Sequence, residues 1–343
     1  HGIPAEVLSR AITLRQIGEV RFLQGRLEPA MEAFTESRDI NAALHASTPE
    51  DNEILFELGQ AEFWVGYTAL EQGNFAQVEQ SFGSYMGLSK TLLSRDPQNQ
   101  DYQLELMYAY SNLGTHALNK SDARSALQYF KKNLELNIHL VTHSPEDRGL
   151  QYDLAETYSW IGSSLLQLHQ LKEAQASYQQ AFDILKVLTT RYERPRYKEE
   201  LGDLARLLAD IHLNQGHLDE AVRLLAVSDE VTAALIAHDN ANKRWQRDRL
   251  RTRYRLLELA VSDGVSPKLE AMASDLVIDY TKLYSSDETN MKITEELALA
   301  EYLMALIQLG SGRAMEAIPL LKLAYARLDT ILLNAQTNRG MSL

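Results

Sequence analysis

The chain has 343 residues, of which 45% are hydrophobic and 24% are charged, and no apolar run reaches the roughly eighteen residues that a membrane helix needs. It has no cysteine, which excludes disulfides, thiolate zinc sites and cysteine nucleophiles. Its 34 basic and 47 acidic residues give a formal net charge of -13, so we expect repulsion from nucleic acid and from anionic lipid surfaces.

A repeat of 48 residues runs along the chain. The stretch QIGEVRFLQGRLEPAMEAF at 16–34 returns in related form as WIGSSLLQLHQLKEAQASY at 160–178. Stepping by 48 from Gly18, with one step of 47 before Ala209, reaches six further reference residues: Gly66, Gly114, Gly162, Ala209, Leu257 and Ala305. We expect one array of seven repeats over residues 1–343, with approximate ranges 4–48, 49–96, 97–144, 145–193, 194–240, 241–288 and 289–336.

Each repeat has the features of two helices joined by a turn. A small residue twelve positions after the reference residue, such as Ala30, and a large one sixteen after it, such as Phe34, predict two closely packed antiparallel helices. Pro49, Pro97 and Pro145, each followed within two residues by Asp or Asn, predict the end of one repeat and the N-cap of the next. The position seven after the reference residue is glycine in five repeats of seven, which predicts a helix end with positive φ at Gly25, Gly73, Ser121, His169, Gly216, Gly264 and Gly312.

This order of small residue, glycine turn, alanine, aromatic residue and proline resembles the tetratricopeptide repeat. The resemblance implies an all-α, right-handed superhelical solenoid of seven helix hairpins. The long period resembles a long-helix variant found in arrays attached to large bacterial signalling proteins, and NANKRWQRD at 240–248 resembles the sequence between their repeats. The implied function is a protein-interaction scaffold in bacterial signalling or regulation. The alternative is a small-molecule or peptide sensor that regulates an attached effector domain.

No sequence pattern indicates catalysis or a bound cofactor. LGSGR at 309–313 lacks the Lys-Ser/Thr ending of a phosphate-binding loop, and no nucleophile elbow is present. His139 and His143 are spaced to share a metal, but a zinc site needs further ligands, and we expect His143 to interact with carbonyls at a helix end. The sequence therefore predicts no enzyme, no metal site and no cofactor.

The resemblance implies that the first helix of each repeat lines a concave groove, with the residues three before and one after the reference residue facing a partner. These positions mix aromatic, hydroxyl and charged groups, which favours an extended peptide or a partner helix as the occupant. The alternative is a groove used only for packing within the chain. The predicted lining is Arg15, Glu19, Phe63, Tyr67, Ser111, Thr115, Ser159, Ser163, Arg206, Asp210, Tyr254, Glu258, Tyr302 and Leu306.

The segment KRWQRDRLRTRYR at 243–255 concentrates seven cations in an acidic chain. Helical spacing aligns two of its arginines with two acids in the preceding repeat. We expect ion pairs between adjacent first helices, Glu199 with Arg247 and Asp203 with Arg251. The alternative use of the arginines is an acidic protein partner.

The last helix pattern, AIPLLKLAYARLDTILL at 317–333, predicts an apolar row that packs on the first helix of the same repeat: Leu321, Ala324, Tyr325, Leu328 and Leu332. Leu320, Leu323 and Ile331 lie off that row. We expect these three residues to pair two copies of the chain, with docking against a downstream segment as the alternative.

The chain begins His1-Gly2 without a methionine, so we expect a piece of a longer protein. We expect a cytoplasmic location, with the periplasm as the alternative.

Overall fold

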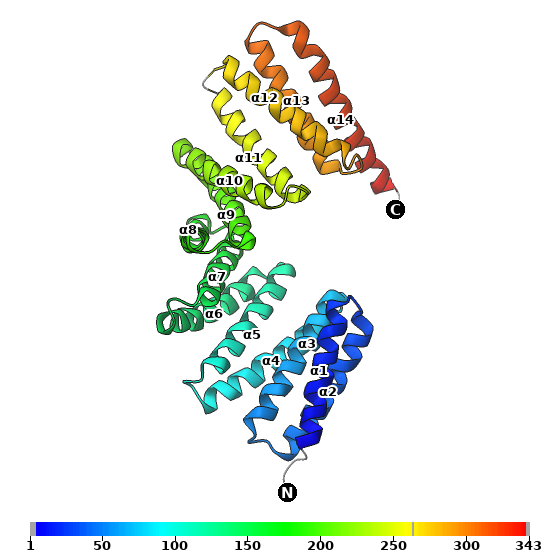
Figure 1. Cartoon of the computed structure of the whole chain (residues 1–343), viewed down its shortest axis with the longest axis vertical. Coiled ribbons are helices and arrows are strands. Elements are labelled where there is room, and N and C mark those ends of the chain that lie inside the picture. Colours follow the sequence, from blue (N-terminus) through cyan, green and yellow to red (C-terminus); the bar gives the residue numbers. More distant parts are fainter. Residues whose placement is uncertain (1–4, 263, 341–343) are drawn as a thin grey trace. The chain divides into compact units, whose positions relative to one another are not determined.

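The computed structural model describes residues 5–262 and 264–340, with side chains through Leu333. Every regular element in these ranges is an α-helix, and successive helices form hairpins (Figure 1). Each of the seven repeats contains one pair of helices. The helices are α1 (Ala5–Leu23), α2 (Leu27–Ser47), α3 (Asn52–Glu71), α4 (Phe75–Arg95), α5 (Gln100–Asn119), α6 (Ala123–His143), α7 (Arg148–Gln167), α8 (Leu171–Arg191), α9 (Pro195–Asn214), α10 (Leu218–His238), α11 (Lys243–Val261), α12 (Pro267–Ser285), α13 (Met291–Gly310) and α14 (Ala314–Gly340).

The turn within each hairpin has the predicted backbone conformation. All seven turn residues have positive φ, between 59° at His169 and 122° at Gly264. In two repeats a residue with a Cβ atom occupies this position, Ser121 with φ 62° and His169 with φ 59°. The prediction of seven positive-φ turns is confirmed.

The predicted N-caps are also present. Asp51 accepts hydrogen bonds from the backbone N–H groups of Glu53 and Ile54 at the start of α3. Asn99 and Asp147 cap α5 and α7 in the same way. Each side chain satisfies donors that a helix leaves unpaired at its N-terminus.

The reference residue and the large residue sixteen positions later meet where the two helices of a hairpin cross. Gly66 of α3 lies directly under the ring of Phe82 of α4, so that a Cβ atom at Gly66 would come within 2.7 Å of the ring. Phe82 is 1% exposed and Val78, one turn earlier on α4, is fully buried. Glycine therefore allows the helix backbones to approach until the ring fills the space between them.

The tertiary contacts divide the chain into two compact units, an N-terminal unit of residues 1–184 and a C-terminal unit of residues 185–343, with the boundary inside α8. Phe34, Phe82 and Phe130 are among the largest buried side chains of the N-terminal unit. The C-terminal unit has a continuous apolar core from α11 to α13 that includes Leu257 and Tyr280. A single array over the whole chain remains a prediction.

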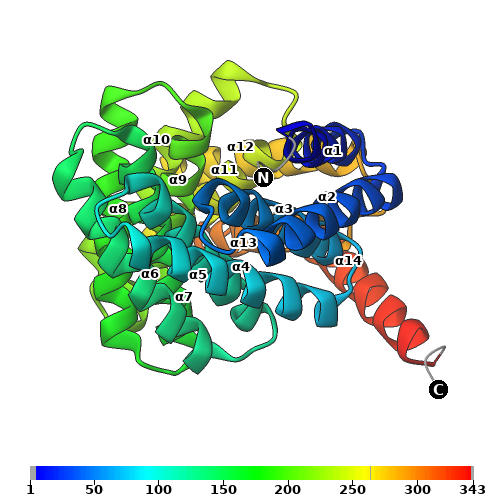
Figure 2. The same cartoon turned by 90° about the horizontal axis from the view of Figure 1, so that it is seen from below.

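The last helix, α14, packs through a different row from the predicted one. Its seven additional residues carry it past the length of α13 (Figure 2). Ala317 and Ala324 are buried, and Leu320 packs against the core of the unit. Tyr325 and Leu332, predicted to face inward, are 72% and 62% exposed. The sequence prediction was right for Ala324 and wrong for Tyr325 and Leu332, because small alanines, and not a tyrosine, fit where two helix backbones approach closely.

Of the three residues predicted to mediate self-association, only one is fully available on the surface. Leu320 belongs to the packing row, and Ile331 is half-buried. Leu323 is 49% exposed. These three residues therefore do not form one outward patch.

Candidate functional site

The predicted lining of the first helices is accessible. None of its members is fully buried, and Asp210, Tyr302 and Leu306 are exposed. The first helices therefore present these side chains at the surface of each unit. Their surroundings differ greatly from repeat to repeat.

In the N-terminal unit, the aromatic members of the lining belong to a ring cluster. Phe63 and Tyr67 stack with ring centroids 5.8 Å apart. Phe63 also contacts Tyr85 of α4 at 5.7 Å, and Tyr67 contacts Phe22 of α1 at 5.3 Å. Both rings are half-buried. They join adjacent helices as well as presenting one face outward.

The charged and hydroxyl members of the N-terminal unit are largely engaged within the protein. Arg15 donates to Glu19 at 2.6 Å and to Glu57 of the next first helix at 3.1 Å. The Ser163 hydroxyl accepts a hydrogen bond from Tyr178 at 3.1 Å. Ser111, Thr115 and Ser159 are half-buried beside them along α5 and α7.

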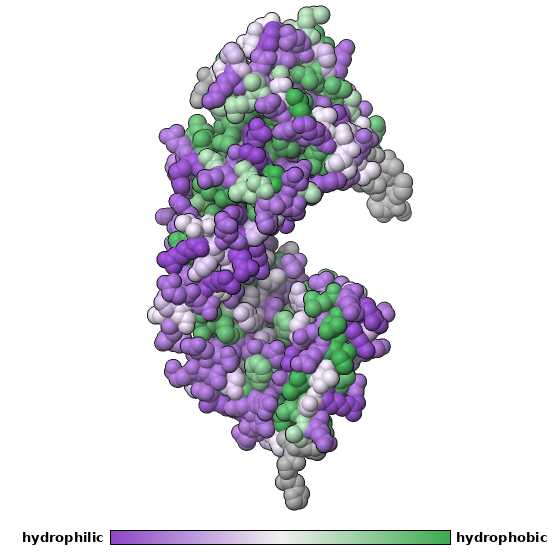
Figure 3. All heavy atoms as spheres, viewed as in Figure 1, coloured by the Kyte–Doolittle hydropathy of each residue, from purple (hydrophilic) through white to green (hydrophobic). Residues whose placement is uncertain are grey.

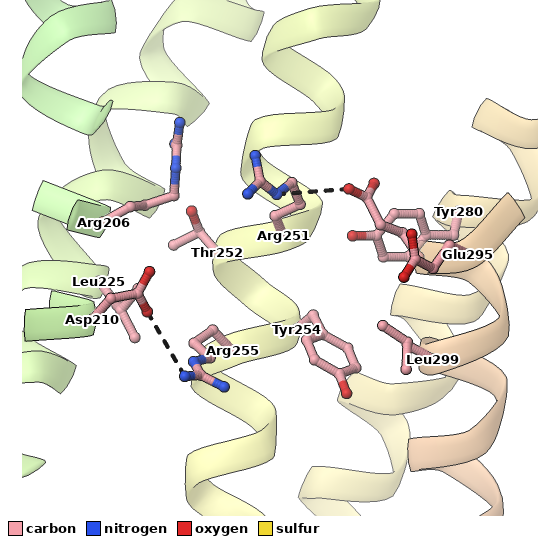
Figure 4. Close-up of a pocket in the computed structure, with 11 residues that line it drawn as sticks. Arg206, Asp210, Leu225, Arg251, Thr252, Tyr254, Arg255, Tyr280, Glu295 and Leu299 are labelled. Atoms are coloured by element: carbon pink, nitrogen blue, oxygen red, sulfur yellow. Dashed lines mark ion pairs between the residues drawn. The ribbon is translucent and has the colours of Figure 1, made fainter. Parts of the chain in front are cut away.

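The C-terminal unit contains a pocket of about 390 Å³ between α9, α11 and α13. Figure 4 shows side chains of α9 and α10 on one side and of α12 and α13 on the other, with four residues of α11 between them. We call this the α11 pocket. It contains three residues of the predicted lining, and it is bounded by Arg206, Asp210, Leu225, Arg251, Thr252, Tyr254, Arg255, Tyr280, Glu295, Glu296 and Leu299.

Ion pairs hold the charged walls of the α11 pocket. Arg255 lies 3.7 Å from Asp210 of α9 and 2.5 Å from Glu258. On the other side, Arg251 lies 3.6 Å from Glu296 of α13 (Figure 4). Between them, burial and then the charge of Glu258 raise the pKa of Tyr254 to about 12, so its hydroxyl stays protonated at neutral pH. The pocket thus offers an aromatic ring, a neutral hydroxyl and both signs of charge.

The predicted ion pairs are formed with different partners. Glu199 pairs with Arg244 at 2.6 Å, and Arg247 pairs with Glu296 of α13 at 2.6 Å. Asp203 pairs with Arg206 and, at 3.6 Å, with Arg244. The predicted pairs of Glu199 with Arg247 and of Asp203 with Arg251 are therefore wrong.

The physical reason is an offset between neighbouring first helices. The pairs Glu199 with Arg244 and Arg251 with Glu296 are each 45 residues apart, one helical turn short of the 48-residue period. Gln60 and Glu105, which hydrogen bond at 2.6 Å, have the same separation. Equivalent positions in adjacent repeats are thus displaced along the helix by about 4.5 Å, the rise of three residues.

This offset reveals a row of acids that the sequence analysis missed. It lies nine residues before the reference position, and each member named here is bonded by a side chain of the preceding first helix. For example, Asp153 accepts from the Tyr108 hydroxyl at 3.4 Å, and Asp248 lies 3.4 Å from Arg206. The 48-residue spacing of the acids was the available signal. The row comprises Glu57, Glu105, Asp153, Asp248 and Glu296.

A second hollow, of about 700 Å³, adjoins the α11 pocket and shares Arg206, Asp210 and Arg251 with it. Lys243, Arg244 and Arg247 add three cations, and Asp203, Asp248 and Asp287 add three acids, so the five cations of this hollow lie among four acids. The basic segment consequently does not present an unbroken cationic surface.

The two histidines considered as metal ligands have other contacts. The His143 ring lies 2.8 Å from the backbone carbonyl oxygen of His139, as predicted for a helix end. His139 contacts Gln103 at 3.2 Å. Within the described residues no group of three or more His, Asp or Glu side chains is arranged to hold a metal ion. A search of those same residues finds no helix with the length and apolar character to cross a membrane.

Solved structures resemble this chain over nearly its whole length. The apo form of RapI matches with a TM-score of 0.51 and 13% identity, over 94% of this chain and 98% of RapI. A STAND protein with a tetratricopeptide repeat sensor from Pyrococcus horikoshii matches with a TM-score of 0.64 and 13% identity, over 96% of this chain and 43% of that one. The chain has a tetratricopeptide-repeat fold. It spans less than half of the STAND protein.

No family model matches the sequence, and no curated protein matches it. The tetratricopeptide fold therefore follows from the helix hairpins and from the structural similarity. Within the C-terminal unit, the α11 pocket brings together three positions of the predicted first-helix lining, Arg206, Asp210 and Tyr254.

Proposed function

We propose that this chain is a protein-interaction scaffold that binds a partner peptide or helix along its first helices, in a bacterial signalling or regulatory protein. The chain itself carries no catalytic role in this proposal, and nucleic acid is not its partner because the net charge is -13. We also propose a cytoplasmic location and self-association through the C-terminal hairpin.

The observation that supports binding most directly is the composition of the α11 pocket. An aromatic ring at Tyr254 and an apolar side chain at Leu299 lie beside the ion pairs of Arg251 and Arg255. Aromatic and arginine side chains supply a large share of the binding energy at protein interfaces. Tyr302, one turn beyond Leu299 on α13, is 46% exposed and extends the same surface.

A photo-crosslinking experiment tests the proposal. A benzophenone amino acid replaces Tyr302, whose exposure leaves the fold intact, and a matched probe replaces Ile278 of α12, which is 49% exposed outside the pocket. We expect one protein to crosslink from position 302 and not from 278, and Arg255→Ala to weaken its capture. Equal crosslinking from both positions, or none from 302, would contradict the proposal.

A second candidate function is a small-molecule sensor. The volume of about 390 Å³ lies in the range of small-molecule sites, roughly 300–1,000 Å³. Native mass spectrometry of the purified chain distinguishes the two functions. A metabolite that is retained by the wild type and lost in Arg255→Ala supports the sensor.

A further inference from the structure

The outward face of α14 carries a row of apolar side chains without a partner in the described residues. Ile318 is 44%, Tyr325 72% and Leu332 62% exposed. Leu328, which is 37% exposed, and Leu321, which is half-buried, complete the row at helical spacing. We call these five residues the α14 row. An exposed apolar surface of this kind marks a contact site on a folded protein.

The equivalent position on earlier second helices meets the following repeat. Leu321 occupies the slot of Phe34 on α2 and of Phe130 on α6. Phe34 stacks on Trp64 of α3 with centroids 5.2 Å apart, and Phe130 stacks on Trp160 of α7 at 6.0 Å. This position therefore lies between the first helix of its own hairpin, where Phe34 covers Gly18, and a helix of the following repeat.

Leu332, the last residue of the α14 row, is also equivalent to a residue that contacts the following repeat. Leu332 occupies the slot of Tyr284 on α12, 48 residues earlier. The guanidinium of Arg327, in the following repeat, lies 4.7 Å from the centroid of the Tyr284 ring. Two positions of the α14 row, Leu321 and Leu332, are thus equivalent to positions that contact the following repeat.

We propose that the helix covering the α14 row is α14 of a second copy, antiparallel to the first and related to it by a two-fold axis at Tyr325. This homodimer rests on the self-association proposed above for the C-terminal hairpin and is independent of the partner proposed for the α11 pocket.

The spacing of the apolar residues favours self-pairing. Ile318 and Leu332 each lie seven residues from Tyr325, on opposite sides. In an antiparallel pair, Ile318 of one copy therefore faces Leu332 of the other. Leu321 lies four residues before Tyr325, and Leu328 lies three after it. Leu321 of one copy therefore lies beside Leu328 of the other, displaced along the helix axis by about 1.5 Å.

Charge complementarity selects the same arrangement. Lys322 and Asp329 lie along one edge of the row, three residues before and four after Tyr325. Both are exposed, and neither has an ion-pair partner among the described residues. A two-fold axis perpendicular to the two helices keeps this edge on the same side in both copies. Lys322 of each copy then faces Asp329 of the other, which gives two ion pairs per dimer.

A competing occupant of the row is α1 of another copy. Figure 3 shows hydrophobic atoms along α1, where Val20 and Leu23 are 55% and 82% exposed. A contact of α14 of one copy with α1 of the next would be heterologous and would join copies into rings or open chains. The two arrangements place different residues next to one another, so crosslinking distinguishes them.

The natural chain has no cysteine, so a single introduced thiol reports one position. We expect Tyr325→Cys to form a disulfide-linked dimer under mild oxidation, because two copies of position 325 meet at the two-fold axis. The matched control is Ala326→Cys, exposed on the same turn but off the row. Equal dimer formation by both variants, or no dimer from Tyr325→Cys, would overturn the proposal.

Sedimentation of the full chain measures the equilibrium. We expect a dimer whose dissociation constant rises roughly 30-fold or more in Tyr325→Glu, the factor for loss of a central aromatic contact. Lys322→Asp and Asp329→Lys should each weaken the dimer, and the two changes together should restore it. A wild type that remains monomeric at micromolar concentration, or a charge exchange without recovery, would contradict two-fold pairing. Circular dichroism confirms that these exposed substitutions leave the helices intact.

Discussion

A methyl group at Gly114 would lie 2.7 Å from the ring of Phe130, closer than two carbon atoms approach without movement. The same relationship recurs in the other repeats of the N-terminal unit. In the C-terminal unit, Ala209 and Leu257 replace the glycine, and the residues sixteen later are Leu225 and Ala273. The two positions of a hairpin thus share one volume. The remaining glycine–ring pairs are Gly18 with Phe34, Gly66 with Phe82 and Gly162 with Tyr178.

We expect Gly114→Ala to lower the free energy of unfolding by about 1–3 kcal/mol, the usual effect of excess volume in a packed core. Phe130→Leu alone should also destabilise, because it leaves unfilled space. The double variant should lose less than the sum of the two, since the smaller side chain accepts the added methyl. Denaturant unfolding followed by circular dichroism measures all three variants. Additive losses would show that the two residues do not share a volume.

Gly87→Ala is the matched control. Gly87 is an exposed helical residue of α4, and no atom lies within 4 Å of its hypothetical Cβ. Alanine should therefore stabilise the chain here by about 1 kcal/mol through helix propensity alone. A loss of stability at this position would indicate that helical glycines serve some purpose other than packing space.

The positive-φ turns make a separate prediction. Ser121→Gly should raise the free energy of unfolding by about 1 kcal/mol, because a side chain with a Cβ atom is strained at φ 62°. His169→Gly, at φ 59°, should have the same effect. Gly73→Ala should be destabilising to a similar degree. If both glycine substitutions lowered the melting temperature, side-chain contacts at these turns would outweigh backbone strain.

These turns and caps could be read from the sequence because local chemistry determines them. Gly73 determines the turn at its own position, and Asp51 caps a helix through residues two and three positions later. Both features recur at intervals of 48 residues, which makes them easy to recognise. The first-helix positions likewise follow from helical spacing. What they contact does not, as Arg15 and Glu57 illustrate by pairing across two repeats.

The ion-pair partners and the face of α14 depend on how helices dock. Arg244 contacts Glu199 of the preceding repeat, 45 residues away, because adjacent first helices are displaced by about one turn, a quantity absent from any single repeat. On α14, two apolar rows compete, and the row with Ala317 and Ala324 packs inward since the backbones approach closely there. Sequence periodicity describes both rows equally well.

One member of the acid row, Glu105, is expected to titrate unusually. Burial raises the pKa of Glu105, although hydrogen bonds from Tyr85 at 2.5 Å and Gln60 at 2.6 Å lower it in part. The folded chain therefore binds this proton more tightly than the unfolded chain, so the free energy of unfolding increases as the pH falls through the folded-state pKa. We expect Tyr85→Phe to raise the pKa of Glu105 further, because a bond to the charged form is lost.

Carboxyl-selective NMR titration measures this pKa directly. Tyr102→Phe, a change of the same type in a half-buried tyrosine of α5, is the control and should leave Glu105 unchanged. A Glu105 pKa at or below the ordinary value of 4.5 in the wild type would contradict the role of burial.

The pair of Arg247 with Glu296 gives the strongest test of how neighbouring repeats are joined. The guanidinium donates through Nε and Nη2, with distances of 2.9 and 2.6 Å, and the side chains are only 26% and 15% exposed. A forked contact shielded from water should give a coupling energy of about 1–3 kcal/mol in a double-mutant cycle of alanine substitutions. The comparison cycle combines Arg247→Ala with Glu199→Ala. These two residues are 48 residues apart and were the pair predicted from the sequence. Its coupling should stay within about 0.5 kcal/mol of zero. If the second cycle gave the larger coupling, the assignment of Glu296, and not Glu199, as the partner of Arg247 would be incorrect.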